Sequence, residues 1–257
     1  MLLEARGLTK SFGGVTAIAD LDFGVPAGLV YAVIGPNGAG KTTLFNLLSG
    51  LYRPDEGRVR FAGEDLTGRA PHQIARLGLA RTFQNLQIFF NMSALENVMV
   101  GAHGRGRAGL AAALLRTPRL RREEAEIRHW AAEALAFCGL ADLADRPASA
   151  LPYGALKRLE IARALVAQPR LLLLDEPAAG LNDTETLALQ GLIGHIRDQG
   201  ITVLLVEHHM GLVMAVAERI LVLDYGSRLA EGTPAEVRAN PAVIAAYLGG
   251  EVHYAVE

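Results

Sequence analysis

Three short, almost continuously apolar runs lie far apart along the chain, and each ends in residues that can do chemistry. The runs are Val30–Ile34, Leu171–Leu174 and Ile201–Val206. Runs of this length are typical of strands that are buried on both faces of a parallel sheet. Ligands bind at the carboxyl ends of such strands. We therefore expect the residues that follow the three runs to contribute to a site.

Alternation of apolar and polar residues marks strands of a different kind. Leu21–Val25 alternates in this way, and so do residues 58–61, where arginines flank the apolar positions. This pattern predicts antiparallel β structure near the N-terminus, which should form a mixed core with the strand Val30–Ile34. Near the other end of the chain, residues 220–231 predict a hairpin that turns at Asp224-Tyr225-Gly226.

Apolar residues three and four positions apart predict two amphipathic helices. Their apolar positions are Leu44, Leu47 and Leu48 in the first helix, and Leu189, Leu192, Ile193 and Ile196 in the second. Gly50 and Gly200 follow these helices and are expected to end them. The run Thr233-Pro234-Ala235-Glu236 has a capping residue, a proline at the first helical position and a glutamate at the third, so a final helix should begin there.

Composition narrows the class of protein. The 257 residues are enough for a sizeable core, and 51% of them are hydrophobic. No apolar run approaches the length of about 18 residues that suggests a membrane span, and the first ten residues lack the apolar core of a signal peptide. Cys138 is the only cysteine, which favours a cytosolic protein. The net charge of −2 argues against a general nucleic-acid binder, so no nucleic-acid partner is expected.

The first apolar run is followed by a phosphate-binding pattern. The residues are Gly35, Pro36, Asn37, Gly38, Ala39, Gly40, Lys41, Thr42 and Thr43. They match G-x-x-x-x-G-K-[ST], which would arise by chance in roughly one of 500 shuffled chains of this composition. Glycines let backbone N–H groups surround phosphates, Lys41 would reach the β and γ phosphates, and Thr42 would ligate Mg²⁺. The alternative is an ordinary glycine-rich turn.

The other two runs end in residues suited to phosphate chemistry. After Leu174, Asp175 could hold Mg²⁺ through water and Glu176 could polarise an attacking water. After Val206, His208 could reach the γ-phosphate. Taken alone, the two acids could merely end a strand, and the histidine could lie in a surface turn. A GTPase is disfavoured because the chain contains no Asn-Lys-x-Asp motif.

In this order the motifs resemble the ATP-binding subunit of ABC transporters over almost the whole chain. Further segments carry the resemblance: Lys10–Gly13 (A-loop), Arg81–Gln84 (Q-loop), Leu151–Ala155 (signature) and Ala179–Asn182 (D-loop). The resemblance implies an α/β P-loop NTPase core with a mixed sheet, an antiparallel β subdomain and an inserted helical subdomain. It divides the single domain 1–257 into an ATP-binding core (1–84 and 169–232), a helical signature subdomain (85–168) and a C-terminal helix and tail (233–257).

The resemblance also implies roles for individual residues. Phe12 would stack on adenine, Gln84 would sense Mg²⁺ beside the two other metal-binding residues Thr42 and Asp175, and Gly154 would cover ATP bound to the opposite subunit. Glu176 and His208 would be the catalytic residues of an ATPase. The cofactors implied are ATP and Mg²⁺.

Within the superfamily, the chain is similar to the larger ATPase subunit of branched-chain amino acid importers. Arg81–Gln84, Tyr153, Ala178–Asn182 and the tail segment 240–249 carry this closer likeness. It implies two multispanning permease subunits, a second ATPase subunit, an external solute-binding protein and a place on the cytoplasmic face of the inner membrane. The second ATPase would be a different chain, although a homodimer could form in isolation. Alternatives are the ATPase of a lipid or polysaccharide exporter, a soluble ABC ATPase and a P-loop kinase.

Two departures from the family pattern concern the subunit interface. In place of Leu-Ser-Gly-Gly-Gln the signature has Pro152 at the serine, Tyr153 at the first glycine and Ala155 at the glutamine. Proline offers neither a hydroxyl nor an N–H to a phosphate, which favours pairing with a different ATPase subunit. Asn182 replaces the usual D-loop aspartate and is expected to cap the next helix with Glu185.

Two further segments allow two interpretations each. The arginine-rich residues 103–122 could contact anionic lipid headgroups or could be a solvated excursion, and the second interpretation is favoured. Phe89, Phe90 and Met92 could line a groove for a cytoplasmic helix of a membrane subunit, or they could belong to the core.

Overall fold

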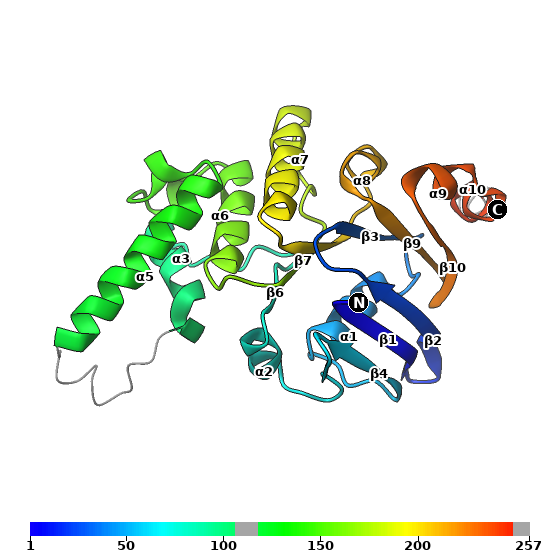
Figure 1. Ribbon diagram of the computed structural model, residues 1–257. Helices are drawn as coiled ribbons and strands as arrows, with labels where there is room; N and C mark the ends of the chain where they lie inside the picture. The colour runs from blue at the N-terminus through cyan, green and yellow to red at the C-terminus, as the bar shows by residue number, and fades with distance from the viewer. Residues whose placement is uncertain (106–117, 249–257) are drawn as a thin grey trace.

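The computed structural model describes residues 1–105 and 118–248, which form two β-sheets and a set of helices (Figure 1). The strands are β1 (Leu3–Phe12), β2 (Val15–Val25), β3 (Val30–Ile34), β4 (Glu56–Phe61), β5 (Glu64–Asp65), β6 (Leu79–Arg81), β7 (Leu171–Asp175), β8 (Thr202–Val206), β9 (Arg219–Asp224) and β10 (Ser227–Gly232). The α-helices are α1 (Lys41–Leu48), α2 (Pro71–Arg76), α3 (Ala94–Gly101), α5 (Pro118–Phe137), α6 (Tyr153–Leu165), α7 (Asp183–Asp198), α8 (Met210–Val216), α9 (Pro234–Ala239) and α10 (Pro241–Leu248). Most of the arginine-rich segment lies outside the described residues.

The larger sheet has six strands in the order β10-β9-β3-β8-β7-β6. All its neighbouring pairs are parallel except β9 and β10, which form the predicted hairpin. The three apolar runs became β3, β8 and β7, in which every residue is buried. These three strands are parallel neighbours. The phosphate-binding loop, the Asp175-Glu176 pair and His208 therefore all lie at the carboxyl ends of the strands, on one side of the sheet, as predicted.

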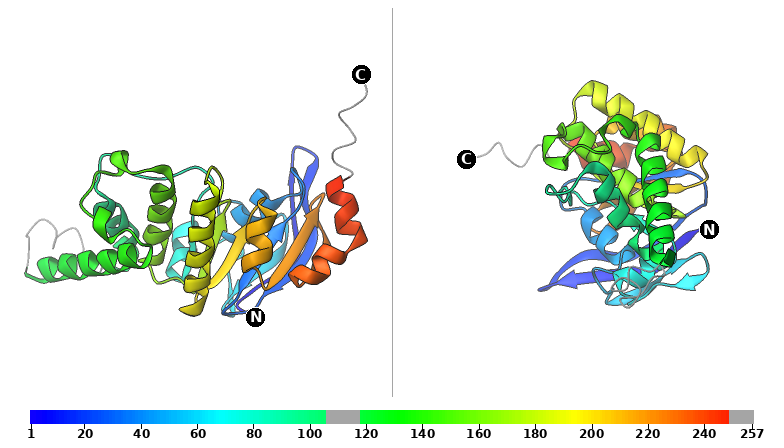
Figure 2. Two further views of the ribbon diagram at one scale, coloured as in Figure 1. Left: turned by 90° about the horizontal axis from the view of Figure 1, so that it is seen from above. Right: turned by 90° about the vertical axis from the view of Figure 1, so that its left-hand side faces the viewer.

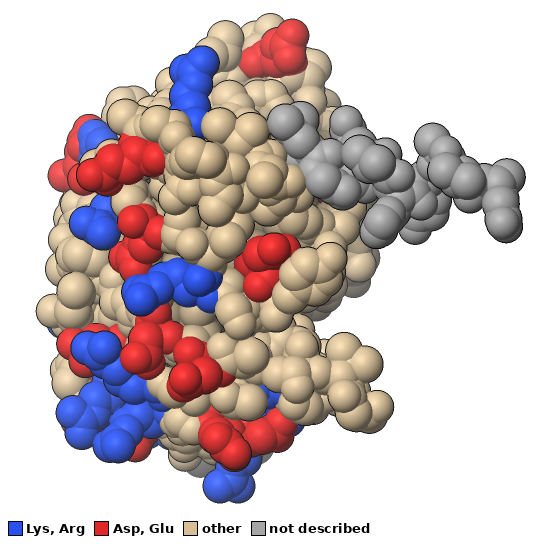
Figure 3. All heavy atoms as spheres, turned by 90° about the vertical axis from the view of Figure 1, so that its right-hand side faces the viewer, with Lys and Arg blue, Asp and Glu red and all other residues tan. Residues whose placement is uncertain are grey.

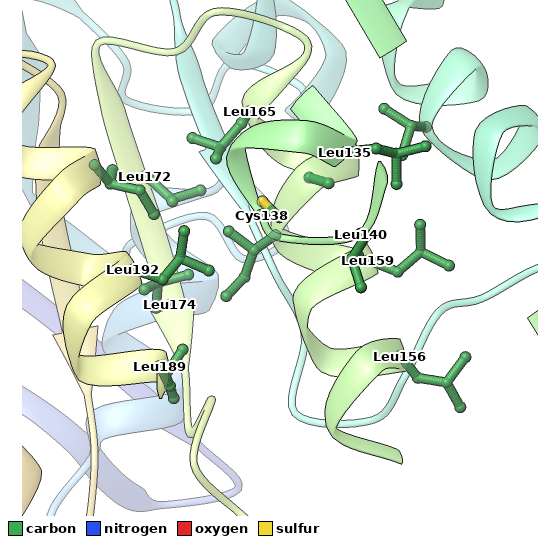
Figure 4. Packing of buried hydrophobic residues seen from close by; sticks show 14 of the residues in the cluster. Leu135, Cys138, Leu140, Leu156, Leu159, Leu165, Leu172, Leu174, Leu189 and Leu192 are labelled. Carbon is green, nitrogen blue, oxygen red and sulfur yellow. The ribbon is translucent and has the colours of Figure 1, made fainter. Parts of the chain in front are cut away.

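Alternate residues of the parallel strands face two different layers. Leu171 and Leu173 belong to a hydrophobic cluster with α1 and the antiparallel sheet, whereas Leu172 and Leu174 pack with α6 and α7. Figure 4 shows Leu172 and Leu174 beside the leucines of α7 and the helices beyond. A strand buried on both faces has no polar alternation, which is why its sequence reads as a continuous apolar run.

The smaller sheet has the order β2-β1-β4-β5 and is antiparallel throughout. The antiparallel structure predicted near the N-terminus is therefore confirmed. It forms a sheet of its own and shares a hydrophobic core with β3, but β3 itself pairs with β8 and β9. The mixed sheet arises instead from the antiparallel β10 at the edge of the six-stranded sheet.

A helical lobe built from α3, α5 and α6 projects from one end of the six-stranded sheet (Figure 2). These helices pack on one another around residues such as Leu135, Cys138 and Leu159. Among the described residues of 85–168 there are helices and turns but no strand. The predicted amphipathic helix before Gly200 is α7, and its four apolar positions are buried.

The C-terminal part differs from the prediction in one respect. One final helix was expected after Thr233, and α9 does begin there with a capping box between Thr233 and Glu236. A second helix, α10, follows at once because proline at 241 cannot continue α9 and suits the first turn of a new helix. Figure 3 shows acidic and basic side chains interspersed on the face that carries these helices.

The start of α7 gives a stability prediction. The Asn182 side chain accepts a hydrogen bond from the Glu185 N–H (2.9 Å), and the Glu185 carboxylate accepts one from the Asn182 N–H (3.1 Å). We expect Asn182→Ala to lower the free energy of unfolding in urea by about 1 kcal/mol, because it removes this cap. Asn182→Asp retains a capping oxygen and is the control. Equal stability of the alanine and aspartate variants would show that the cap contributes nothing.

Candidate active site

Two positions in the loop between β3 and α1 have a backbone conformation and close neighbours that only glycine can accommodate. Gly40 has φ 99°, and a Cβ atom on it would lie 2.4 Å from the Ala17 carbonyl oxygen of β2. Gly35 is equally constrained, since its Cβ would lie 2.2 Å from the Leu223 carbonyl oxygen. The N-cap of α1 is Gly40, which has no side chain to cap the helix, so the first N–H groups of α1 can face an anion. Lys41 and Thr42 are the first two residues of the helix.

Lys41 lies inside this loop. It is 6% exposed, and its ammonium group donates to the carbonyl oxygens of Gly35 (2.7 Å) and Pro36 (2.9 Å). Burial lowers the pKa of Lys41, and the negative charge of Glu176 opposes that shift. The loop therefore combines a lysine cation with the amino end of a helix, which is the electrostatic environment that polyphosphate requires.

Glu176 lies at the centre of a three-residue contact. Its carboxylate accepts a hydrogen bond from the Gln84 amide (2.9 Å) and lies 3.0 Å from Nε2 of His208. The three residues follow β7, β6 and β8, so the order of strands in the sheet brings them together. Glu176 has φ 47°, a left-handed conformation that is costly for a residue with a side chain and is concentrated at functional sites.

Asp175 is buried beneath this contact and is paired with Arg81. Its carboxylate accepts from the guanidinium at 2.8 Å, and the side chains of Arg81 and Asp175 are 6% and 3% exposed. Burial raises the pKa of Asp175, and the hydrogen bond and positive charge of Arg81 oppose that rise. Arg81 also donates to Asn46 (2.7 Å) and Ser49 (2.8 Å) at the end of α1.

Arg81 thus links separate parts of the site. This residue was given no role of its own by the sequence analysis. It joins α1 to the strand that carries the acidic pair, and the aromatic rings of Phe45 and Phe83 lie 5.6 and 5.0 Å from its guanidinium carbon. The only sequence signal is an arginine at the end of a short strand, which does not reveal its neighbours.

The signature segment lies at the start of α6, in the helical lobe. The Tyr153 hydroxyl donates to the Ala179 carbonyl oxygen of the D-loop (3.2 Å). A Cβ atom on Gly154 would lie 2.3 Å from the carboxylate of Glu185. Within one chain, Gly154 therefore packs against the start of α7, whereas the phosphate-binding loop lies across the sheet beside α1 (Figure 1).

Phe12 lies on the hairpin that approaches the phosphate-binding loop. Phe12 is 43% exposed, and its ring meets that of Tyr52 edge to face with ring centres 5.2 Å apart. The next strand of the hairpin, β2, carries the Ala17 carbonyl oxygen that confines Gly40. Lys10 lies 5.3 Å from the Phe12 ring centre and is paired with Asp55.

Comparisons with known proteins identify the family of the chain. The family model described as "ABC transporter" matches residues 18–179, which is more than half of the chain. The chain belongs to the ABC transporter family. It is accordingly an ATPase with the P-loop fold that the motifs predicted. A second model, "Branched-chain amino acid ATP-binding cassette transporter", matches residues 227–253.

Individual relatives refine the comparison. The chain is 47% identical to the high-affinity branched-chain amino acid transport ATP-binding protein BraF of Pseudomonas aeruginosa, over 96% of this chain and 98% of the relative. It is 36% identical to the lipopolysaccharide export system ATP-binding protein LptB of Acidithiobacillus ferridurans, over 97% and 98%. A crystal structure of an ABC transporter cassette in its ADP conformation has a TM-score of 0.84 and 32% identity, and it covers 96% of this chain and 98% of the solved one.

Proposed function

We propose that this ABC ATPase powers an importer of branched-chain, hydrophobic amino acids at the cytoplasmic face of the inner membrane. The observation that carries the proposal is the 46–47% identity, over 96% of the chain, to ATP-binding proteins named for high-affinity branched-chain amino acid transport. The relative named for lipopolysaccharide export is 36% identical over a similar length, which makes export the weaker alternative.

The proposed nucleotide site combines the phosphate-binding loop and the start of α1 with residues of β1, β7 and the loop after β6. ATP would be held by the N–H groups of the loop 35–43 and by the Lys41 ammonium, with the adenine against Phe12. Mg²⁺ would be held by Thr42, Asp175 and Gln84. All three donors are oxygens and one of them is a carboxylate, which suits Mg²⁺, an ion bound in proteins through one or two carboxylates together with substrate phosphates. Bound Mg²⁺ would neutralise charge on those phosphates.

Glu176 is the proposed general base for the attacking water. The contact with His208 at 3.0 Å and the hydrogen bond from Gln84 hold its carboxylate at the edge of the sheet where the γ-phosphate would lie. His208 would also bind that phosphate. Gln84 lies at the start of the segment that leads to the helical lobe, so it could report the state of the site to the membrane subunits.

Two ATPase subunits would complete the site, each presenting the start of α6 to the ATP of the other. Gly154 and the N–H groups there would supply this contact, because Pro152 is the residue before α6 and offers no side-chain cap. Because Pro152 replaces the signature serine, this chain offers one contact fewer to the ATP of its partner. This fits a heterodimer in which the signature of the other ATPase subunit keeps that serine.

A groove of about 530 Å³ beside the Q-loop is the proposed contact with a permease subunit. Phe89 and Arg163 line it, and Phe89 and Phe90 are 43% and 50% exposed. The interpretation of these two phenylalanines as core residues is therefore wrong. None of the helices in residues 1–105 and 118–248 has the length and apolar character needed to cross a bilayer.

The test is to purify the complex that forms around this chain and to reconstitute it in lipid vesicles. We expect two multispanning proteins and a second ATPase to copurify, and labelled leucine, isoleucine or valine to be transported only with ATP and the external binding protein. Glutamate is the control solute. A complex that extracts lipid and moves no amino acid would establish the export alternative.

A further inference from the structure

Glu207 is a buried acid directly after β8, one residue before His208. Its exposure is 3%, although glutamate is seldom fully buried without a specific partner. One carboxylate oxygen accepts a hydrogen bond from the N–H of Ala178 at 2.7 Å. The other accepts from the N–H groups of His208 at 2.8 Å and His209 at 3.0 Å.

The bond from Ala178 joins two separate segments of the site, because Ala178 lies in the loop that leads from Glu176 to the D-loop and Glu207 begins the loop after β8. The bonds from His208 and His209 fix the backbone of that second loop around the same carboxylate. Each hydrogen bond pairs a charged acceptor with a backbone donor, a class of bond about twice as strong as one between neutral groups. The carboxylate therefore sets the distance between the two backbones at the level of the Glu176–His208 contact.

The same contact is supported on its other side. The N–H of Glu176 donates to the carbonyl oxygen of Val206 at 2.9 Å, as an extension of the pairing between β7 and β8. Without the Glu207 carboxylate, the bond from Glu176 to Val206 would be the last one that the backbone of the acidic segment makes to β8 or to the loop that follows it. The left-handed backbone of Glu176 also needs such support, because that conformation is costly.

We propose that Glu207 is a positioning residue for ATP hydrolysis, which holds the His208 loop against the Glu176 segment so that the two catalytic side chains stay in contact. The proposal rests on the proposed roles of Glu176 and His208. The three hydrogen bonds of the Glu207 carboxylate all come from backbone N–H groups, and Glu207 does not touch the reacting groups. It acts through the position of His208.

The test is Glu207→Gln in the full chain, assayed in the reconstituted complex. Glutamine has the same shape, but its NH₂ group cannot accept a hydrogen bond, so the variant loses either the bond from Ala178 or the two bonds from His208 and His209. We expect kcat for ATP to fall about 10- to 100-fold, the effect of a small misplacement at a catalytic site, while KM changes less than about twofold.

A matched control is Glu218→Gln. The Glu218 carboxylate also accepts from a backbone N–H, that of Val30 (3.4 Å), at the opposite edge of the sheet. This variant should leave kcat unchanged. Because a merely structural effect could also reduce turnover, the ring nitrogens of His208 are followed by ¹⁵N NMR, assigned from a His208→Asn variant. The His208 ring resonances should shift in Glu207→Gln and not in Glu218→Gln.

Each outcome decides the question. An unchanged kcat overturns the proposal, and so does a reduced kcat with His208 resonances in their original position. A fall in kcat that matches a loss of folded protein in urea makes Glu207 a purely structural residue and also overturns it. If the wild-type complex fails to hydrolyse ATP, the proposed function fails, but the NMR comparison still tests Glu207.

Discussion

Glu176→Gln is expected to lower ATP turnover by at least about 10²–10⁴-fold, the usual contribution of a general base. The amide cannot take a proton from water, but it has the shape of the carboxylate. It can keep one oxygen as an acceptor for Gln84, which now donates at 2.9 Å. The phosphate-binding loop is untouched, so ATP should bind as before.

The measurement has two parts, ATP binding by the isolated chain and hydrolysis by the complex. The matched control is Glu236→Gln, whose carboxylate accepts a backbone hydrogen bond in the α9 capping box and lies outside the proposed nucleotide site. It should retain turnover. Near-normal hydrolysis by the Glu176→Gln complex would falsify the assignment of Glu176 as general base, and lost ATP binding would point to a role in nucleotide affinity.

Local features of this fold could be predicted because their causes are local. The strand Val30–Ile34 is the same in the sequence pattern and in the structure, since burial on both faces leaves a continuous apolar run. The capping box at Asn182 was also readable, because the donors and acceptors lie three residues apart. The loop 35–43 was found in the same way, from the spacing of its glycines and lysine.

Non-local features were missed. The order of strands that places β6 beside β7 is not present in any single segment, so the role of Arg81 could not be inferred from Asp175, which lies 94 positions away. Glu207 was passed over for the same reason, because its partner Ala178 is 29 positions away. The separate pairing of the antiparallel sheet also depends on packing between distant segments.

The second large effect concerns stability. Arg81→Leu is expected to lower the free energy of unfolding by about 3–5 kcal/mol, because it leaves the buried Asp175 carboxylate without its partner. Asn46 and Ser49 at the end of α1 lose their guanidinium donor as well. The measurement is urea unfolding of the isolated chain, followed by circular dichroism.

An exposed ion pair of the same chemistry provides the control. Arg69 and Glu64 are 2.9 Å apart, but their side chains are 35% and 58% exposed. Arg69→Leu should therefore cost at most about 1 kcal/mol. Replacing both buried partners, Arg81→Leu with Asp175→Leu, should recover part of the stability lost in the single variant, because no uncompensated charge remains buried.

The double variant separates two explanations of a large loss. If Arg81→Leu destabilises the chain because the buried Asp175 charge loses its partner, removal of that charge restores stability. If the loss comes instead from the contacts of the guanidinium with the rings of Phe45 and Phe83 and from its bonds to α1, the double variant stays as unstable as the single one. A loss below about 1 kcal/mol for Arg81→Leu itself would mean that Asp175 is solvated or protonated, contrary to the buried ion pair.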